Sequence, residues 1–309
     1  MKAIRNLIEN ADNNRMNHWT IYLDYFELDA RSRQLSKFTI KVNGERLALL
    51  ARWLDQNGID IEDVTRNDIQ KYLLSIYGTV SDETVAGRIR TYKRFWNVLI
   101  EGEVWNKPNP MDGIKKPRVS KKLRRTISPV EFDMVLGACQ KRTFLGYRNF
   151  IILLLLWDCM LRRGEIASLR LDNVDLRAGT LIVKGKGNKV RIVPMGAKTI
   201  KSLHFYIHKH RSKYAGNYLF CTHQGKPISL VHIHQICSRT AKKAGLKMGC
   251  HIIRHSSATE YLRRGGQLGI LSKILGHTDI TTTAIYTHMS IDDAVKSYEQ
   301  YSPASSLSI

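Results

Sequence analysis

The chain has 309 residues, of which 43% are hydrophobic, and a formal net charge of +22 at pH 7. This length predicts one or two domains, and the hydrophobic share is ample for packed cores. So large an excess of Lys and Arg indicates a polyanionic partner, nucleic acid before membrane. The alternative is that these cations only solvate the surface.

The cysteines and the apolar segments exclude several further classes. The five cysteines are odd in number and form no C-x-x-C pair, so neither a disulfide framework nor a zinc site is indicated. The most apolar run, residues 150–157, has about eight residues, whereas a membrane span needs about twenty. The N-terminus lacks the apolar core of a signal peptide. We therefore expect a soluble cytoplasmic protein without a membrane association.

The first hundred residues have a helical pattern throughout. Amphipathic helices are predicted around residues 19–26 and over residues 36–57, 65–78 and 81–102. Thr65 with Asp68 forms a variant of the capping box that opens the third of them. The exposed face of the fourth is expected to carry Arg88, Arg90, Lys93 and Arg94. These cations suit a DNA-gripping helical module, and a plain bundle with solvated cations is the alternative.

Residues 105–125 differ in composition from the helices before them. Three prolines and Gly113 interrupt regular structure. The cations Lys115, Lys116, Arg118, Lys121, Lys122, Arg124 and Arg125 crowd together against a single acidic residue, Asp112. The segment is predicted to be an interdomain linker that lies along DNA phosphates.

The next hundred residues predict a second, mixed domain. Ser128 with Glu131 forms a capping box, and a buried helix over residues 147–160 leads into the segment Leu161-Arg162-Arg163-Gly164-Glu165. Residues 180–183 and 190–193 read as strands joined by a glycine-rich basic turn, which predicts a β-hairpin. Helices over residues 198–214 and 229–245 and a short strand at 218–220 complete the pattern.

The segment from His251 to Tyr286 gathers the residues that suit attack on a phosphodiester. His251 and Arg254 are three apart, so they share one face of a predicted helix. A second helix ends at Gly276, which can take the left-handed conformation that closes it. His277 follows directly, and Tyr286 lies nine residues later in a Thr-rich stretch.

The pattern H-x-x-R-H, then L-G-H, then this tyrosine resembles the signature of the tyrosine recombinases, the phage integrase family, in the form of the simple Xer-type or Cre-type enzymes. The segments L-R-x-x-E and G-K-G-N-K match the family's first arginine and hairpin lysine. The resemblance implies a mainly α fold with a small β-hairpin sheet. It implies a helical core-binding domain over residues 1–104, a basic linker over 105–125 and a catalytic domain over 126–309.

The resemblance and the chemistry of strand cleavage together suggest a role for each residue. Planar guanidinium groups suit a phosphate clamp, for which Arg162 and Arg254 are the candidates. Lys186, between two glycines, is expected to protonate the leaving oxygen; Lys189 is its rival and otherwise a DNA contact. His251 is expected to support acid–base chemistry, His277 to bind a non-bridging oxygen, and Tyr286 to form a 3′-phosphotyrosine. Glu165, three residues after Arg162, is expected to be an orienting partner, with structural buttressing as the alternative, and Arg163 ranks behind Arg162.

No metal or other cofactor is expected, because cationic side chains supply the charge. The expected partners are double-stranded DNA with inverted half-sites and three further copies of the chain, with a second recombinase as a possible partner. The alternative enzyme is a type IB topoisomerase-like relaxase. A DNA-binding accessory protein without chemistry is a third reading, and the presence of all six candidate residues speaks against it. One departure from the family stands out: Met160 occupies a position where members commonly have glycine, which puts the local turn in doubt.

Overall fold

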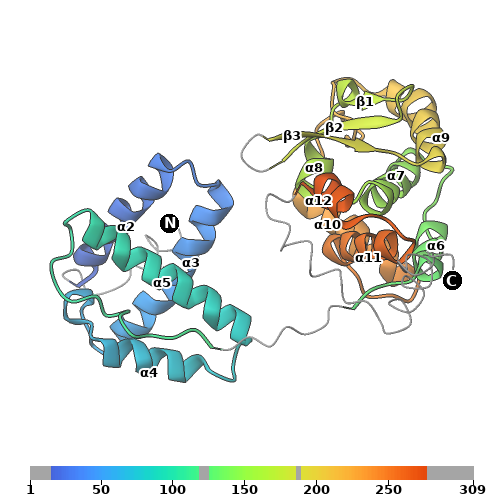
Figure 1. Ribbon diagram of the computed structural model, residues 1–309. Coiled ribbons are helices and arrows are strands. Elements are labelled where there is room, and N and C mark those ends of the chain that lie inside the picture. The colour runs from blue at the N-terminus through green and yellow to red at the C-terminus, as the bar shows by residue number, and fades with distance from the viewer. Residues whose placement is uncertain (1–14, 118–124, 186–188, 277–309) are drawn as a thin grey trace, which may run out of the picture. The chain divides into compact units, whose positions relative to one another are not determined.

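The computed structural model describes residues 15–117, 125–185 and 189–276, with side chains from Trp19 onward. The chain divides into two compact units, Met1–Lys122 and Leu123–Ile309 (Figure 1). The first unit is helical, and the second combines helices with a small sheet. This is the mainly α fold with a small sheet that the sequence predicts.

Four α-helices form the described part of the first unit. They are α2 (Arg15–Ser32), α3 (Lys37–Gln56), α4 (Arg66–Ile76) and α5 (Asp82–Glu101), with a 3₁₀ turn, η1 (Ile61–Asp63), between α3 and α4. Ser36, Thr65 and Ser81 cap α3, α4 and α5. Thr65 and Asp68 form a complete capping box, because each side chain accepts from the other's backbone N–H.

Helix α5 supplies the centre of the first core. Tyr92, Phe95 and Trp96 are fully buried on it, and α2 and α3 pack against it. The Phe95 ring stacks on Trp19 of α2 at a centroid distance of 5.9 Å. Burial of side chains of this size removes a large apolar area from water, so α5 holds the unit together.

The first unit extends further along the chain than the sequence predicts. Trp105, Met111 and Ile114 are buried in the same core as the helices. Residues 105–114 therefore belong to the first unit and not to the linker assigned to residues 105–125. Of the linker cations, Lys115 and Lys116 are exposed, whereas Lys121 and Lys122 lie outside the described residues.

The second unit begins with three helices that lead into its sheet. They are α6 (Pro129–Gly137), α7 (Phe144–Asp158) and α8 (Arg163–Ser168), followed by a 3₁₀ turn, η2 (Leu171–Asn173). Ser128 and Glu131 form the predicted capping box of α6. The sheet contains β1 (Val174–Asp175), β2 (Thr180–Lys184) and β3 (Val190–Pro194), antiparallel in the order β1-β2-β3.

Further helices follow the sheet. Helix α9 (Ala197–Phe205) continues through a π-helical turn, η4 (Tyr206–His210), and a 3₁₀ turn, η5 (Arg211–Lys213), where one regular helix was predicted. The predicted strand at 218–220 is reduced to a single bridge between Arg170 and Tyr218. Helices α10 (Leu230–Lys243), α11 (Cys250–Arg263) and α12 (Leu268–Leu275) complete the described part.

Helix α7 is the central element of the second core. Ile151, Ile152, Leu153, Leu155 and Leu156 are completely buried on it, and α11 packs alongside (Figure 1). Each such side chain contributes about 1.5–3 kcal/mol on burial. The end of α7 and the start of α11 are thereby fixed relative to each other, and these are the places from which Arg162 and Arg254 project.

The sheet covers this core with one face only. Leu181, Val183 and Val193 are buried, whereas Ile182 and Ile192 are exposed on the outer face.

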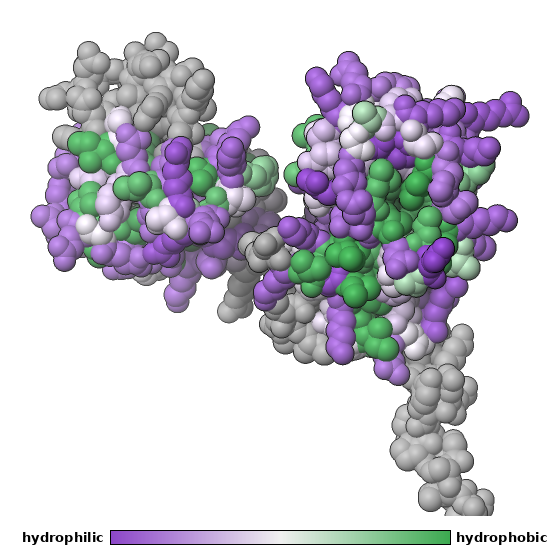
Figure 2. All heavy atoms as spheres, turned by 90° about the horizontal axis from the view of Figure 1, so that it is seen from above, coloured by the Kyte–Doolittle hydropathy of each residue, from purple (hydrophilic) through white to green (hydrophobic). Residues whose placement is uncertain are grey.

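Figure 2, seen from above, shows hydrophobic surface on the second unit bordered by hydrophilic side chains. Among the described helices of the chain, none is both long and apolar enough to cross a bilayer.

Candidate active site

Arg162 lies at the start of α8, and its guanidinium group is partly exposed. Its backbone is extended, and its N–H donates to Glu165 Oε2 at 2.7 Å. This is the reciprocal half of a capping box, in which an acidic residue in the first turn accepts from the residue before the helix. The Arg162 side chain is 38% exposed, and its Nη1 donates to Glu165 Oε1 at 3.0 Å. The rest of the guanidinium can therefore reach a ligand.

Met160 forms the turn between α7 and Arg162 in a left-handed conformation. Its φ is +51°, a region that favours glycine. The side chain is buried with Ala258, Leu271 and Leu275, which stabilises a turn that costs strain in a non-glycine residue. The turn therefore has the conformation glycine would take, although methionine occupies it.

Arg254 is buried on α11 and binds two backbone carbonyls from distant segments. Its Nη1 donates to the carbonyl of Met160, and its Nη2 donates to that of Leu275 at 2.9 Å. Nη1 also lies 3.9 Å from Glu165 Oε2. One guanidinium thus joins the turn before Arg162 to the end of α12.

Glu165 collects the arginines around one carboxylate. Its side chain is only 4% exposed, and Arg191 of β3 binds it through two hydrogen bonds, Nη1 to Oε1 at 2.7 Å and Nη2 to Oε2 at 2.9 Å. Burial tends to raise the pKa of Glu165, but the hydrogen bonds from Arg191 and from the Arg162 backbone outweigh it and keep the pKa below its usual value. Glu165 is therefore ionised at neutral pH.

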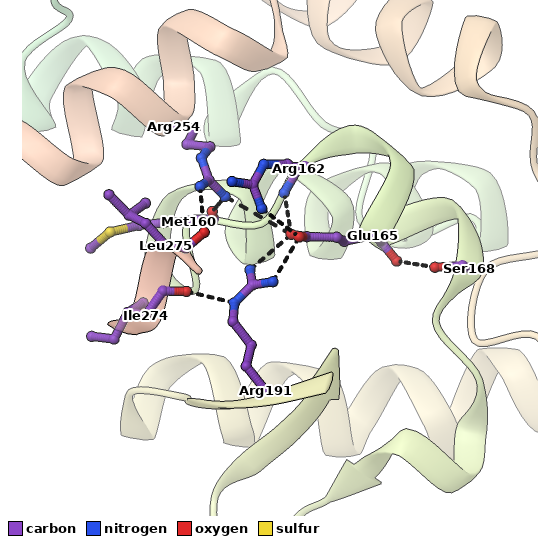
Figure 3. A network of polar contacts seen from close by, with 8 residues as sticks. All are labelled: Met160, Arg162, Glu165, Ser168, Arg191, Arg254, Ile274 and Leu275. Carbon is purple, nitrogen blue, oxygen red and sulfur yellow. Dashed lines mark hydrogen bonds and ion pairs between the residues drawn. The ribbon is translucent and has the colours of Figure 1, made fainter. Parts of the chain in front are cut away.

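The cluster has an excess of positive charge. Arg162, Arg191 and Arg254 converge on the single carboxylate of Glu165 (Figure 3). Three guanidinium groups and one carboxylate leave a net charge of +2. The two positive charges that the carboxylate does not neutralise favour binding of an anion. A phosphate suits the site because a planar guanidinium group can donate two hydrogen bonds to it.

His251 lies at the start of α11, one turn before Arg254, and is exposed where Arg254 is buried. Lys189 is exposed at the base of the hairpin turn, and its carbonyl accepts the Gly185 N–H at 2.8 Å. Gly276 has the predicted left-handed conformation, with φ of +62°. Lys186, His277 and Tyr286 lie outside the described residues.

The four cations predicted to bind DNA from α5 are less free than the sequence suggests. Arg90 is exposed, and it pairs with Glu83 at 3.0 Å. Arg88, Lys93 and Arg94 are half-buried and so do not form the exposed face that was expected. Arg88 donates to the Tyr72 hydroxyl at 3.0 Å, and Arg94 pairs with Asp29 at 3.1 Å.

Sequence reasoning missed Arg191. A signal was present in the sequence of β3. Exposed and inward-facing side chains alternate along this strand, and Arg191 shares the inward face with buried Val193. An arginine at an inward position of a strand requires a partner, and Glu165 was the carboxylate already placed beside a candidate catalytic arginine.

Comparison with known proteins agrees with this architecture. Residues 125–292, more than half of the chain, match the phage integrase family. The tyrosine recombinase XerC of Bacillus pumilus is 28% identical, over 92% of this chain and 95% of its own. The tyrosine recombinase XerD of Staphylococcus haemolyticus is 30% identical, over 92% of this chain and 99% of its own.

Solved structures show the same fold. XerA recombinase is 27% identical with a TM-score of 0.52, over 92% of this chain and 99% of its own. XerH recombinase, in a post-cleavage complex with palindromic difH DNA, has a TM-score of 0.72 at 20% identity, over 94% of this chain and 88% of its own; it shares the fold alone. The chain belongs to the phage integrase family. Within that family it is a tyrosine recombinase, an enzyme that cleaves and rejoins DNA, similar to the Xer proteins.

Proposed function

We propose that the chain carries out site-specific recombination with Tyr286 as the nucleophile and Arg162, Lys186, His251, Arg254 and His277 as the groups around the scissile phosphate. The observation that supports this best is the convergence of Arg162 and Arg254 on Glu165. They come from the start of α8 and from α11, and together with Arg191 they exceed the carboxylate by two charges. Such a surplus suits the charge that develops on a phosphate under attack.

The reaction follows from these roles. The Tyr286 oxygen attacks phosphorus, and the bond from phosphorus to the 5′-oxygen breaks. Arg162 and Arg254 bind the non-bridging oxygens with His277, while His251 accepts the phenolic proton. Lys186 gives a proton to the 5′-oxygen, which leaves as a hydroxyl. Because the 3′-phosphotyrosine keeps the energy of the phosphodiester, a 5′-hydroxyl from another strand can reverse the step without ATP.

The partner in this proposal is duplex DNA with inverted half-sites, on which four copies of the chain assemble across two sites in the cytoplasm. The first unit, including residues 105–114, acts as the core-binding domain, and residues 126–309 act as the catalytic domain. Phosphates are bound by the cations of the linker and the hairpin, which are Lys115, Lys116, Lys121, Lys122 and Lys189.

A nicked suicide substrate tests the proposal directly. The nick lets a short fragment diffuse away after cleavage, so the covalent protein–DNA adduct accumulates and can be counted on a denaturing gel. Wild-type protein should form the adduct, and Tyr286→Phe should bind the same DNA with unchanged affinity and form none. An adduct in Tyr286→Phe would exclude this nucleophile, and tight binding without any wild-type adduct would favour the accessory protein.

The relaxase alternative is tested with two-site substrates. A recombinase should exchange strands between two sites and shift in size to a tetramer on DNA. Relaxation of supercoils by a monomer, without recombinant product, would favour the topoisomerase-like activity instead.

A further inference from the structure

Two cysteine side chains meet in the core of the second unit. Cys237 lies on α10 and Cys250 is the first residue of α11, and their sulfur atoms are 3.2 Å apart. Both residues are buried, Cys237 completely and Cys250 with 5% of its surface exposed. Both thiols are free. A disulfide between them requires an approach of about 1 Å, because bonded sulfur atoms are about 2.05 Å apart.

The pair differs from the other three cysteines of the chain in its acidity. Burial raises the pKa of Cys139 to about 11, and it also raises the pKa of Cys159 and of Cys221. The hydrogen bond between the pair lowers the pKa of Cys250 and raises that of Cys237, because a donating thiol stabilises the thiolate that accepts. Cys250 also lies at the N-terminus of α11, where the helix favours a thiolate. The core therefore holds a nucleophilic sulfur with a second thiol beside it.

Cys250 is also close in the chain to residues of the candidate active site. His251 follows it directly, and Arg254 lies one turn further along, so Cys250 and Arg254 share one face of α11. Arg254 donates to the carbonyls of Met160 and Leu275, which ties this part of α11 to the turn before α8 and to the end of α12. A shift of the start of α11 toward α10 therefore disturbs these contacts and moves His251.

We propose that Cys237 and Cys250 are a site of reversible oxidation, at which a hydroperoxide forms a disulfide that draws the start of α11 toward α10 and slows DNA cleavage. The effect on cleavage rests on the proposed function, in which His251 and Arg254 act at the phosphate. Displacement of a catalytic group by about 1 Å can cost about 10²-fold in rate. Disulfides in a reducing compartment are typically transient and sense oxidants, which is the behaviour expected of this pair.

The oxidation proceeds in two balanced steps. The Cys250 thiolate attacks one oxygen of hydrogen peroxide, so a sulfur–oxygen bond forms and the oxygen–oxygen bond breaks. The departing oxygen takes up the proton that the thiol lost and leaves as water. The Cys237 sulfur then attacks the sulfenic acid, so the disulfide forms, the sulfur–oxygen bond breaks and a second water leaves. The two thiols are oxidised and the peroxide is reduced, and a dithiol reverses the change by exchange with the disulfide.

Treatment of the full chain with hydrogen peroxide tests the proposal. Reduced and treated protein are compared on the nicked suicide substrate, in single-turnover assays with saturating protein. Tandem mass spectrometry of the treated protein should locate a disulfide between Cys237 and Cys250, and adduct formation should be about 10- to 100-fold slower than in the reduced protein. Dithiothreitol should restore the rate, whereas damage by methionine oxidation would persist, because its repair requires dedicated reductases.

Cysteine variants separate the disulfide from other oxidative damage. Cys237→Ala and Cys250→Ala should cleave at close to the wild-type rate when reduced, and they should keep that rate after peroxide. Cys139→Ala is the matched control, because it removes a more exposed thiol outside the pair, and it should lose activity with peroxide as the wild type does. No disulfide, a disulfide between other cysteines, or equal inhibition of Cys237→Ala and wild type would overturn the proposal.

The outcomes also separate this inference from the proposed function. Reduced wild-type protein that forms no adduct would contradict the proposed function, whereas the mapped disulfide would still test the oxidation site. A normal adduct from reduced protein, with the disulfide formed and the rate unchanged, would contradict the link between the pair and the active site. The comparison of reduced, oxidised and re-reduced wild type needs no variant, so it holds even where a substitution prevents folding.

Discussion

The two units of the chain use arginine in opposite ways. In the first unit, Arg33 binds Asp29 and Glu101, and Arg94 binds Asp29 as well. Two cations meet two anions, and most of the four side chains are substantially exposed. In the second unit three arginines surround one buried carboxylate.

The difference separates a solvated network from a binding site. Exposed pairs such as Arg33 with Glu101 contribute about 0–1 kcal/mol, because water screens them. A buried surplus of positive charge is costly to keep, so it is expected where a ligand supplies the missing negative charge. Both the charge balance and the burial therefore point to the second unit as the place where phosphate binds.

Glu165→Gln should produce the largest change. The substitution leaves Arg191 and Arg254 buried without their carboxylate, which should lower the free energy of unfolding of the second unit by about 3–5 kcal/mol. Glu101→Gln, the matched change in the balanced network, should cost less than about 1 kcal/mol. Urea unfolding followed by circular dichroism measures both, and equal losses would remove the distinction between the two networks.

The same variant has a pH signature. Because the pKa of Glu165 is lowered in the folded chain, its stabilising contribution is complete above its unfolded pKa of about 4.3 and is lost as the pH falls through the folded value. The stability difference between wild type and Glu165→Gln should therefore be constant near neutral pH and shrink at acid pH. A difference that does not change between pH 7 and pH 3 would mean that the carboxylate is not the source of the effect.

Arg162→Ala should affect the reaction more than the fold. The side chain is 38% exposed, so its loss should change the unfolding free energy little. Removal of one charged donor from the developing phosphate charge should slow adduct formation by at least about 10²–10³-fold. Arg33→Ala is the matched change in the first unit and should leave the cleavage rate of bound DNA unchanged. Normal cleavage by Arg162→Ala would exclude it from the phosphate clamp.

Gly276→Ala should have an intermediate effect on stability. A left-handed residue with a Cβ costs about 1–2 kcal/mol, and here the added atom also meets Arg191 at 3.0 Å. Gly265→Ala is the matched control, because Gly265 is also left-handed, with φ of +87°, but its Cβ would meet nothing within 4 Å. Thermal unfolding should show the larger loss in Gly276→Ala, and equal losses would mean that contact with Arg191 has no cost.

Local signals explain which features the sequence predicts well. Thr65 with Asp68 and Ser128 with Glu131 are capping boxes three residues apart, and Gly276 closes its helix by its own conformation. Each of these features depends on neighbours in the chain, so pattern is enough to find it.

The features that the sequence misses depend on distant partners. Arg191 binds Glu165, 26 residues away, and Ile274, 83 residues away, and no local pattern announces either contact. Trp105, Met111 and Ile114 have no helical period and stand among prolines, so they read as linker although they complete a core. Tertiary packing decides both cases, and only the inward position of Arg191 on its strand hinted at one of them.

The smallest effect should appear in DNA binding. The number of cations that contact phosphates sets how steeply DNA affinity falls with salt, so this slope compares ion-paired with exposed cations. Lys115 and Lys116 are exposed, and removing both by Lys115→Ala with Lys116→Ala should reduce the slope of log affinity against log salt by about 2, with a uniform loss across DNA sequences. Arg90 holds Glu83 at 3.0 Å, so Arg90→Ala should change the slope by less than about 1. Glu83→Gln should make the salt dependence steeper, because it releases Arg90 to bind a phosphate. If Arg90→Ala instead matches the effect of a full phosphate contact, the ion pair opens on DNA, and pairing in the free protein does not decide which cations bind.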